Sequence, residues 1–312
     1  MNSNLNEDAL DTKYIVQCQN LIKIYKSSDD IEVVALQGLD LNIKQGELMA
    51  IIGNSGSGKS TLLNMIGCLD NPTAGKLIVD GKDLFKLSKE EIITYKKQTV
   101  GFVWQNNARN LIPYLTALEN VELALSITRQ KNKKEKALKY LDLVSISHRK
   151  NNSLSELSGG EQQRIAIAIA LANNPKILLA DEPTGSVDSK TANLILDLFR
   201  DINREIGVTI IIVTHDGQIS AKVDRVVAIR DGKTSSEFIR KVSYSEELKS
   251  IEKGLYDKSQ FGNTHMELAI LDKAGRLQIP SEYLKALNLK DKTKIKVELE
   301  DEKIILYSPD KR

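Results

Sequence analysis

Short apolar runs recur along most of the chain, and each ends in a polar or glycine-rich turn. Runs of this length without polar alternation are typical of strands buried on both faces of a sheet. We expect such strands at 47–53, 76–80, 99–104, 176–181 and 208–214. Segments with helical periodicity separate them, at 59–67, 116–144 (interrupted at 129–136), 158–173 and 189–205. This alternation predicts an α/β fold with a mostly parallel sheet covered on both faces.

The pattern changes after Gly232, where the chain becomes polar and rich in Ser, Lys and Glu. We expect a linker there, with one helix at 245–253. The last segment again shows alternating strands around a Gly275-Arg276 turn, with a short helix at 281–287 and strands at 294–300 and 303–307. The sequence therefore predicts an α/β domain over 12–233, a linker over 234–263 and a small, mostly β domain over 264–312.

Composition excludes some classes of function. The chain has 312 residues, 41% apolar and 28% charged, with a net charge of +2. This small net charge gives no overall electrostatic attraction to nucleic acid or anionic lipid. The spacing of its two cysteines, Cys18 and Cys68, does not indicate a disulfide. Their scarcity suits a reducing compartment. The polar N-terminus does not resemble a signal peptide, and no run approaches the roughly 20 apolar residues of a membrane span. A membrane role would need another chain.

The turn after the first buried strand carries the strongest motif. It reads Gly53, Asn54, Ser55, Gly56, Ser57, Gly58, Lys59, Ser60, and it matches the phosphate-binding loop G-x-x-x-x-G-K-S/T. Glycines let backbone N–H groups surround phosphates, and the following helix presents its positive end to them. Lys59 supplies charge to the β- and γ-phosphates, and Ser60 a hydroxyl ligand for Mg²⁺. A Gly/Ser turn that binds nothing is the alternative, which the lysine and the flanking strand and helix disfavour. We assign residues 53–61, through Thr61, to nucleotide binding.

Two adjacent carboxylates, Asp181 and Glu182, end another buried strand. Ligands in open α/β sheets lie outside the carboxyl ends of strands, so both fall in the same layer as the phosphate loop. Asp181 can reach the Mg²⁺ shell, and Glu182 can polarise an attacking water. Alone, such a pair can equally be the start of a loop or a helix cap.

A second anion-binding nest opens the helix at 158–173, formed by Ser158, Gly159 and Gly160. Ser158 and Glu161 also fit a helix-capping box, and both roles can hold together. One nucleotide cannot easily use this nest and the Lys59 loop within a single monomer.

From about residue 15 to 232 the sequence resembles the ATPase of ABC transporters. Leu157–Arg164 matches that family's signature motif, and the remaining elements follow in the family's order. The resemblance implies a P-loop NTPase fold with a helical subdomain, ATP and Mg²⁺ as cofactors, and a head-to-tail homodimer with ATP between Lys59 of one copy and Ser158 of the other. It implies four further roles: adenine stacking for Tyr25 (with Tyr14 upstream as the alternative), metal contact and permease sensing for Gln105, the D-loop aspartate for Asp188, and γ-phosphate contact for His215.

Residues 62–75 and 180–189 resemble the macrolide-exporter and lipoprotein-release branch of the family. That resemblance implies a FtsX/MacB-like membrane permease as partner, docked near Gln105 and residues 106–118, and a peripheral position on the cytoplasmic face of the membrane. Trp104 and Tyr114 could contribute to docking, although sheet-edge packing is the favoured reading of Trp104. Asn54 replaces the branch's usual proline, and Ser186-Val187 replace its usual Asn-Leu; neither change removes a catalytic group.

Residues 266–307 resemble the AbrB/MazE-type swapped-hairpin domain, whose members form intertwined dimers and often bind DNA. Residues 264–312 contain ten Lys/Arg and nine Asp/Glu, whereas DNA binding requires a basic face. We therefore favour a dimerisation clamp, with a DNA-binding regulator as the alternative.

Overall fold

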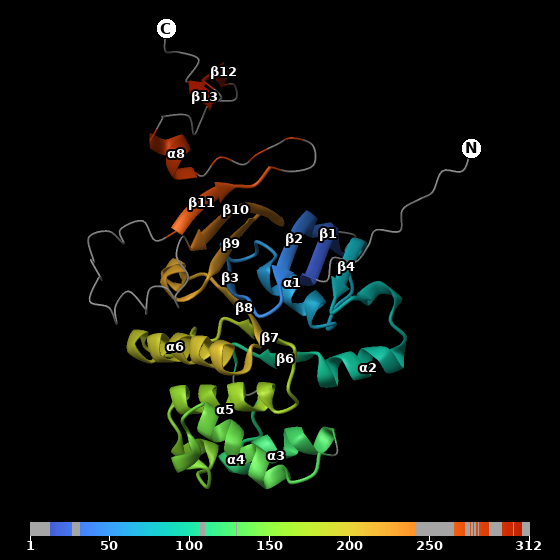
Figure 1. Cartoon of the computed structure of the whole chain (residues 1–312), viewed down its shortest axis with the longest axis vertical. Helices are drawn as coiled ribbons and strands as arrows, with labels where there is room; N and C mark the ends of the chain where they lie inside the picture. Colours follow the sequence, from blue (N-terminus) through green and yellow to red (C-terminus); the bar gives the residue numbers. More distant parts are fainter. Residues whose placement is uncertain are drawn as a thin grey trace.

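A seven-stranded sheet forms the centre of the described chain (Figure 1). The computed structural model describes residues 13–26, 32–106, 110–128, 130–240, 265–271, 275, 277, 279, 281–286, 295–301 and 303–307. The central five strands are parallel, in the order β9 (Arg225–Arg230), β3 (Leu48–Ile52), β8 (Thr209–Thr214), β7 (Ile177–Asp181) and β6 (Val100–Val103). The antiparallel strands β10 (Lys233–Arg240) and β11 (His265–Ala269) extend the sheet beyond β9.

An antiparallel sheet lies beside the central one and was not expected as a separate layer. Its order is β2 (Glu32–Lys44), β1 (Tyr14–Lys26), β4 (Ala74–Val79) and β5 (Lys82–Asp83). Helix α1 (Lys59–Ile66) is buried between the two sheets, since Leu62, Leu63 and Ile66 join one hydrophobic cluster with residues of both. The phosphate loop is thus held from two sides.

Helices cover the other face of the central sheet, and α3, α4 and α5 gather as the expected helical subdomain at the lower end of Figure 1. The helices on this side are α3 (Ala117–Ile127), α4 (Lys133–Leu143), α5 (Gly159–Leu171) and α6 (Ser189–Ile206). Helix α2 (Lys89–Gln98) instead packs on the side of α1, where its buried Tyr95 joins the core between the two sheets. Short 3₁₀ turns lie at Leu84–Lys86, Ser147–Arg149, Leu154–Glu156 and Gly217–Lys222.

Successive side chains of each central strand point to opposite faces of the sheet, and each face has its own apolar core. The sequences of these strands are therefore continuously apolar. On β7, Leu178 and Ala180 join the core under the helices, whereas Ile177 and Leu179 join the core shared with α1. Both faces of the sheet are buried, so most positions of these strands are apolar. The prediction of an α/β fold with a sheet covered on both sides is confirmed.

The predicted linker is wrong for residues 234–240. These residues form β10, which pairs with β9 on one side and β11 on the other. The segment is polar, but Ser235 and Ser236 are buried, and the Ser235 hydroxyl donates to the Ala228 carbonyl at 3.1 Å. Hydrogen-bonded hydroxyls can occupy a buried strand without an apolar pattern, so the polar sequence of β10 does not distinguish it from a linker.

The C-terminal segment begins inside the central sheet, because β11 pairs with β10. Leu271 and Leu277 then form a bridge around Gly275, which has a φ of 75° suited to the expected turn. Helix α8 (Ser281–Ala286) and the hairpin of β12 (Lys296–Glu300) and β13 (Lys303–Tyr307) match the expected elements. The helix expected at 245–253 falls outside the described residues. No helix of the described chain is long and apolar enough to cross a membrane.

Candidate active site

The phosphate loop joins β3 to α1, with Gly58 as the N-cap of the helix in a left-handed conformation. The Lys59 side chain turns back into the loop, where its Nζ donates to the carbonyls of Gly53 at 2.8 Å and Asn54 at 3.0 Å. Lys59 is only 7% exposed. The Ser57 hydroxyl is also buried there, with no partner among the described residues. A buried cation and a buried unpaired hydroxyl in one glycine-rich loop fit an anion such as phosphate.

Ser60 and Asp181 meet across the gap between α1 and the carboxyl end of β7. The Ser60 hydroxyl donates to Asp181 Oδ1 at 3.0 Å. A hydroxyl and a carboxylate oxygen are the hard ligands that Mg²⁺ accepts when phosphates and water complete its shell. Among the described residues no group of three or more His, Cys, Asp or Glu could form an all-protein metal cage. The paired Ser60 hydroxyl and Asp181 carboxylate fit Mg²⁺ whose other ligands come from a nucleotide and water.

Glu182 occupies a strained position directly after β7. Its φ is 46°, in the left-handed region that non-glycine residues rarely adopt. Its N–H donates to the Val213 carbonyl at 2.9 Å, and its own carbonyl accepts from Gly185 N–H at 3.0 Å. These two bonds fix the turn on the neighbouring strand β8 and aim the carboxylate out of the sheet edge.

The Glu182 carboxylate lies between two residues at the end of β8. Thr214 Oγ1 donates to Glu182 Oε2 at 3.2 Å, and His215 Nδ1 lies 2.9 Å from Oε1. The carboxylate side chain is 14% exposed, whereas the His215 ring is 71% exposed. The ring is therefore held on its inner side and accessible on its outer side. Sequence reasoning missed Thr214, although it directly precedes His215.

Gln105 lies close to the turn that carries Glu182. It follows β6, the neighbour of β7, and its Nε2 is 3.3 Å from where a Cβ on Gly185 would lie. The chain just before it is fixed by Asn110, whose side chain accepts from Trp104 N–H and donates to the Phe102 carbonyl. The Trp104 ring stacks on Phe102 with centroids 3.9 Å apart, which agrees with its interpretation as sheet-edge packing.

Tyr25, rather than Tyr14, lies beside the phosphate-loop helix. Tyr14 begins β1, and Tyr25 lies near its other end. The Tyr25 hydroxyl donates to Asp70 Oδ2 at 2.6 Å, and the Thr61 side chain of α1 is near enough to lower the pKa of the phenol, against the larger effects of burial and Asp70 that raise it. Tyr25 is 39% exposed.

Ser158 and Asp188 both cap helices within the chain. Ser158 forms the expected capping box with Glu161 at the start of α5. Asp188 caps α6 by accepting from the N–H groups of Lys190 and Thr191, each at 3.0 Å. A Cβ on Gly160 would lie 2.4 Å from the Thr191 methyl group, so the two helix starts pack closely. Figure 1 shows α5 apart from α1: the nest of Ser158, Gly159 and Gly160 does not join the Lys59 loop in this chain.

Comparison with known proteins identifies the family. Residues 36–185 match the family described as ABC transporter. An uncharacterized ABC transporter ATP-binding protein, MJ0796 of Methanocaldococcus jannaschii, is 44% identical over 229 residues, which cover 72% of this chain and 96% of that protein.

Solved structures agree with this match. The dimeric structure of the MJ0796 cassette has a TM-score of 0.65 at 42% identity, covering 71% of this chain and 97% of the other. A dimeric post-hydrolysis state of MJ0796 bound to ADP and Pi has a TM-score of 0.64 at 43% identity, with the same coverage. CbiO1 of Clostridium perfringens, part of the ABC transporter complex cbiONQ, has a TM-score of 0.66 at 28% identity, covering 78% and 93%.

The chain belongs to the ABC transporter ATP-binding proteins. It is an ATP-binding, ATP-hydrolysing subunit of an ABC transporter with the fold of the MJ0796 cassette. Nothing in these matches supports the DNA-binding alternative.

Proposed function

We propose that this subunit hydrolyses Mg²⁺-ATP with residues from four neighbouring elements. Lys59 binds the β- and γ-phosphates, and Ser60, Asp181 and Gln105 hold the metal, which would neutralise phosphate charge. The observation that carries this proposal is the convergence of the α1 start with the ends of β7 and β8. Lys59→Ala is expected to weaken ATP binding about 10- to 150-fold, the worth of a charge-assisted hydrogen bond. Lys190→Ala, at the exposed start of α6, is the matched control; retained affinity in Lys59→Ala would contradict the assignment.

Glu182 accepts the proton of the attacking water in this proposal. Its backbone turn and the Thr214 hydroxyl hold the carboxylate at one orientation. His215 contacts the γ-phosphate with its exposed side and remains aligned by the 2.9 Å contact with Glu182. A base held before the substrate arrives loses little orientational entropy during the reaction.

Two copies form the catalytic unit, with Ser158, Gly159 and Gly160 of one copy completing the site around Lys59 of the other. The separation of α5 from α1 within the chain supports this arrangement, as does the dimeric structure of MJ0796. An isologous two-fold interface gives two equal composite sites. Asp188 lies near that interface, since it accepts from the hydroxyl of Thr191, whose methyl group faces Gly160.

Complementation tests whether the sites are shared. Gly159→Asp places a negative charge at the nest, and Gly159 has space for it, since a Cβ there meets nothing closer than 3.8 Å. Lys59→Ala and Gly159→Asp should each be inactive alone. A mixture contains heterodimers with one intact composite site, so ATP hydrolysis should reappear. Absence of any recovery in proven heterodimers would refute the shared site.

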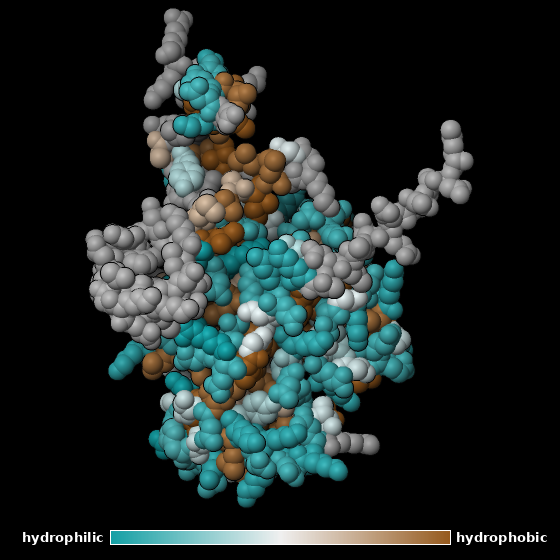
Figure 2. Space-filling view, in the orientation of Figure 1, coloured by the Kyte–Doolittle hydropathy of each residue, from teal (hydrophilic) through white to brown (hydrophobic). Residues whose placement is uncertain are grey.

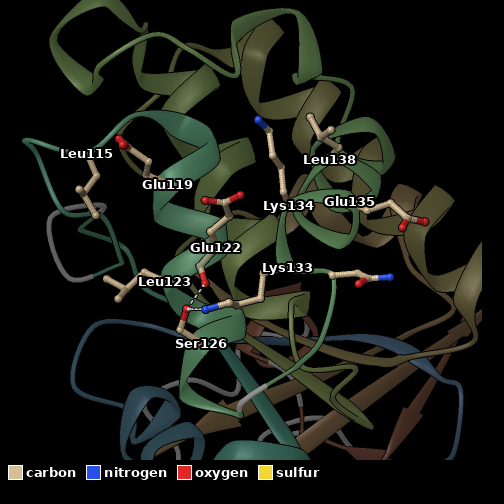
Figure 3. A pocket seen from close by; sticks show the side chains of 10 residues that line it. Leu115, Glu119, Glu122, Leu123, Ser126, Lys133, Lys134, Glu135 and Leu138 are labelled. Atoms are coloured by element: carbon tan, nitrogen blue, oxygen red, sulfur yellow. Dashed lines mark hydrogen bonds between the residues drawn. The ribbon is translucent and has the colours of Figure 1, made fainter.

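A groove on the helical subdomain supports docking of a membrane permease. It has a volume of about 990 Å³ between α3 and α4, with Leu115, Leu123 and Leu138 as apolar lining and Glu122 and Lys134 among its charged groups (Figure 3). The groove adjoins residues 106–118, where docking was expected, and Tyr114 there is 83% exposed. The partner we propose is a FtsX/MacB-like permease, which places this subunit peripherally at the cytoplasmic face of the membrane.

The docking proposal predicts an uncoupled variant. Leu123 is 47% exposed, and Leu123→Asp should leave basal ATP hydrolysis unchanged but abolish stimulation by the co-reconstituted permease. Leu194, 49% exposed on α6, is the matched control position. Normal stimulation of Leu123→Asp would contradict docking in this groove.

The C-terminal segment serves as a dimerisation clamp of the swapped-hairpin type. One face of the β12–β13 hairpin is formed by the cross-strand pairs Val297–Leu306 and Leu299–Ile304. Val297, Leu299 and Ile304 are 62%, 76% and 67% exposed, and Figure 2 shows apolar surface gathered over this upper part of the molecule. An isolated two-stranded hairpin is marginally stable in water, so a second copy would stabilise it.

The clamp is tested without nucleotide. Leu299→Glu should shift the protein from dimer to monomer in analytical ultracentrifugation, while Glu300→Gln, on the other hairpin face, should not. An unchanged dimer fraction in Leu299→Glu, or a monomeric wild type, would refute the clamp.

A further inference from the structure

A small polar cluster fixes the ring of Tyr25 against the phosphate-loop helix. Asp70, just beyond the end of α1, accepts from Lys23 Nζ with Oδ1 and from the Tyr25 hydroxyl with Oδ2, both at 2.6 Å. Lys23 Nζ also donates to the Asn71 carbonyl at 2.7 Å and lies 4.6 Å from the centre of the Tyr25 ring. The Thr61 side chain of α1 acts on the same phenol, so Tyr25 interacts both with α1 and, through Asp70, with the segment that follows it.

The cluster is built into the fold rather than placed on its surface. Lys23 is 9% exposed, an unusual burial for a lysine, and its ammonium is satisfied by the Asp70 carboxylate, the Asn71 carbonyl and the ring. Backbone bonds join the same two segments: Thr73 N–H donates to the Ile22 carbonyl at 2.8 Å. The chain after α1 is therefore joined to β1 by both side-chain and backbone hydrogen bonds.

Electrostatics keep these groups in the required states. Burial would raise the pKa of Asp70, but hydrogen bonds from Lys23, Tyr25 and the Asn71 N–H overcome that effect and lower it, so the carboxylate is ionised at neutral pH. Burial and the Asp70 bond raise the pKa of Tyr25, so the phenol keeps its proton and remains a donor.

One face of the Tyr25 ring, the face opposite the Lys23 ammonium, remains for stacking. The ammonium occupies one face, and 39% of Tyr25 is exposed, so a planar base would cover the opposite face. Two aromatic faces repel when stacked directly, because both are electron-rich. A cation behind the tyrosine draws electron density away from the free face and reduces that repulsion. A ring fixed in advance also loses no rotamer freedom on stacking.

We propose that Asp70 and Lys23 are positioning residues that hold Tyr25 as a fixed, electron-poor platform for the nucleobase of the bound nucleotide. The inference rests on the proposed contact between Tyr25 and adenine. It adds that Asp70 and Lys23 connect the residue that contacts the base to helix α1, which begins at the phosphate loop.

The test compares ATP with inorganic triphosphate, which has the phosphates but no base. Asp70→Asn and Lys23→Met should each weaken ATP binding about 5- to 10-fold in calorimetric titrations, a part of the roughly 5- to 150-fold worth of one stacked base. Triphosphate affinity should not change. At saturating ATP the turnover number should stay at the wild-type value, so that only KM rises, and Lys23→Arg should restore binding.

Other outcomes are equally informative. Equal losses for ATP and triphosphate would mean that the phosphate loop was displaced, and would overturn the proposal, as would unchanged ATP binding in both variants. Combining Asp70→Asn with Tyr25→Phe, which removes the phenol but keeps the ring, should cost no more than the larger single change; additive losses would count against the shared bond. Tyr25→Ala distinguishes the adenine contact from the positioning of the ring. If Tyr25→Ala leaves ATP affinity unchanged, the proposed contact between Tyr25 and adenine is wrong. If Tyr25→Ala weakens ATP binding but the Asp70 and Lys23 variants bind ATP normally, only the positioning role is refuted.

Discussion

Two glycines of the phosphate loop provide a matched pair of perturbations. Gly56 has a φ of 77° and Gly58 a φ of 100°, so both occupy the left-handed region. Their surroundings differ. A Cβ on Gly56 meets nothing within 4 Å, whereas a Cβ on Gly58 would lie 2.5 Å from the Ala35 carbonyl oxygen and 2.7 Å from a Leu36 methyl group on β2.

The magnitudes follow from these contacts. Alanine in a left-handed conformation costs about 1–2 kcal/mol at either position. Overpacking against β2 adds about 1–3 kcal/mol at Gly58. Gly58→Ala should therefore reduce the free energy of unfolding by about 2–5 kcal/mol, and Gly56→Ala by only about 1–2 kcal/mol.

Urea unfolding of the nucleotide-free protein measures the difference. Far-UV circular dichroism reports the whole fold, and the single tryptophan, Trp104, reports the central sheet at β6. Because nucleotide is absent, lost phosphate contacts cannot contribute. Equal destabilisation by the two alanines would refute the claim that β2 confines the loop at Gly58.

Two further substitutions test other parts of the structure. Glu237→Gln on β10 weakens a bidentate bond to the partly buried Arg225 guanidinium and should cost about 1.5–3 kcal/mol in urea unfolding. The same change at the exposed Glu135 should cost less than about 0.5 kcal/mol; equal costs would argue against β10 as an integral strand. Glu161 has a pKa lowered below its ordinary 4.5 by the Ser158 N–H, the Ser158 hydroxyl and, less strongly, Arg149. Its contribution is present at neutral pH and is lost as pH falls through the folded-state pKa, so the stability gap between wild type and Glu161→Gln should narrow between neutral pH and about pH 3. A gap that stays constant would show that the carboxylate charge does not matter there.

The parts of the fold that the sequence predicted are those with local signals. Strands β3, β7 and β8 are buried on both faces, and their uninterrupted apolar runs reveal them. Lys59, Ser60, Asp181 and Glu182 could be placed together because each ends or directly follows such a strand or begins the next helix. His215 was assigned only through the resemblance to the family. The carboxyl ends of parallel strands necessarily meet at one edge.

Strands β1 and β2 of the antiparallel sheet were missed because their pattern is irregular, whereas β4 was expected as a strand at 76–80. The pairing of β1 with β2 shifts register at several points, including between Cys18 and Leu21 and between Lys23 and Ile24. Each bulge breaks the two-residue alternation by which a strand is recognised. Strand β10 was missed for another reason: its polar sequence, which includes the two buried serines, is also typical of a linker.

Residues that act through distant partners left no signal either. Asp70 reads as a loop carboxylate until the fold places it beside Tyr25, 45 positions away. Asp188 was expected only at the nucleotide site, and its capping of α6 depends on where that helix begins. Such roles arise from contacts, and a single sequence does not record contacts.

The direct test of the hydrolysis mechanism is the turnover of Glu182→Gln. Glutamine keeps the size of the side chain and can still accept from Thr214, but it cannot take a proton from water. Single-turnover ATP hydrolysis should fall by about 10²- to 10⁴-fold, the usual contribution of a general base. ATP affinity should be retained, and an ATP-bound dimer should accumulate. Hydrolysis at the wild-type rate would contradict the assignment of Glu182 as the catalytic base.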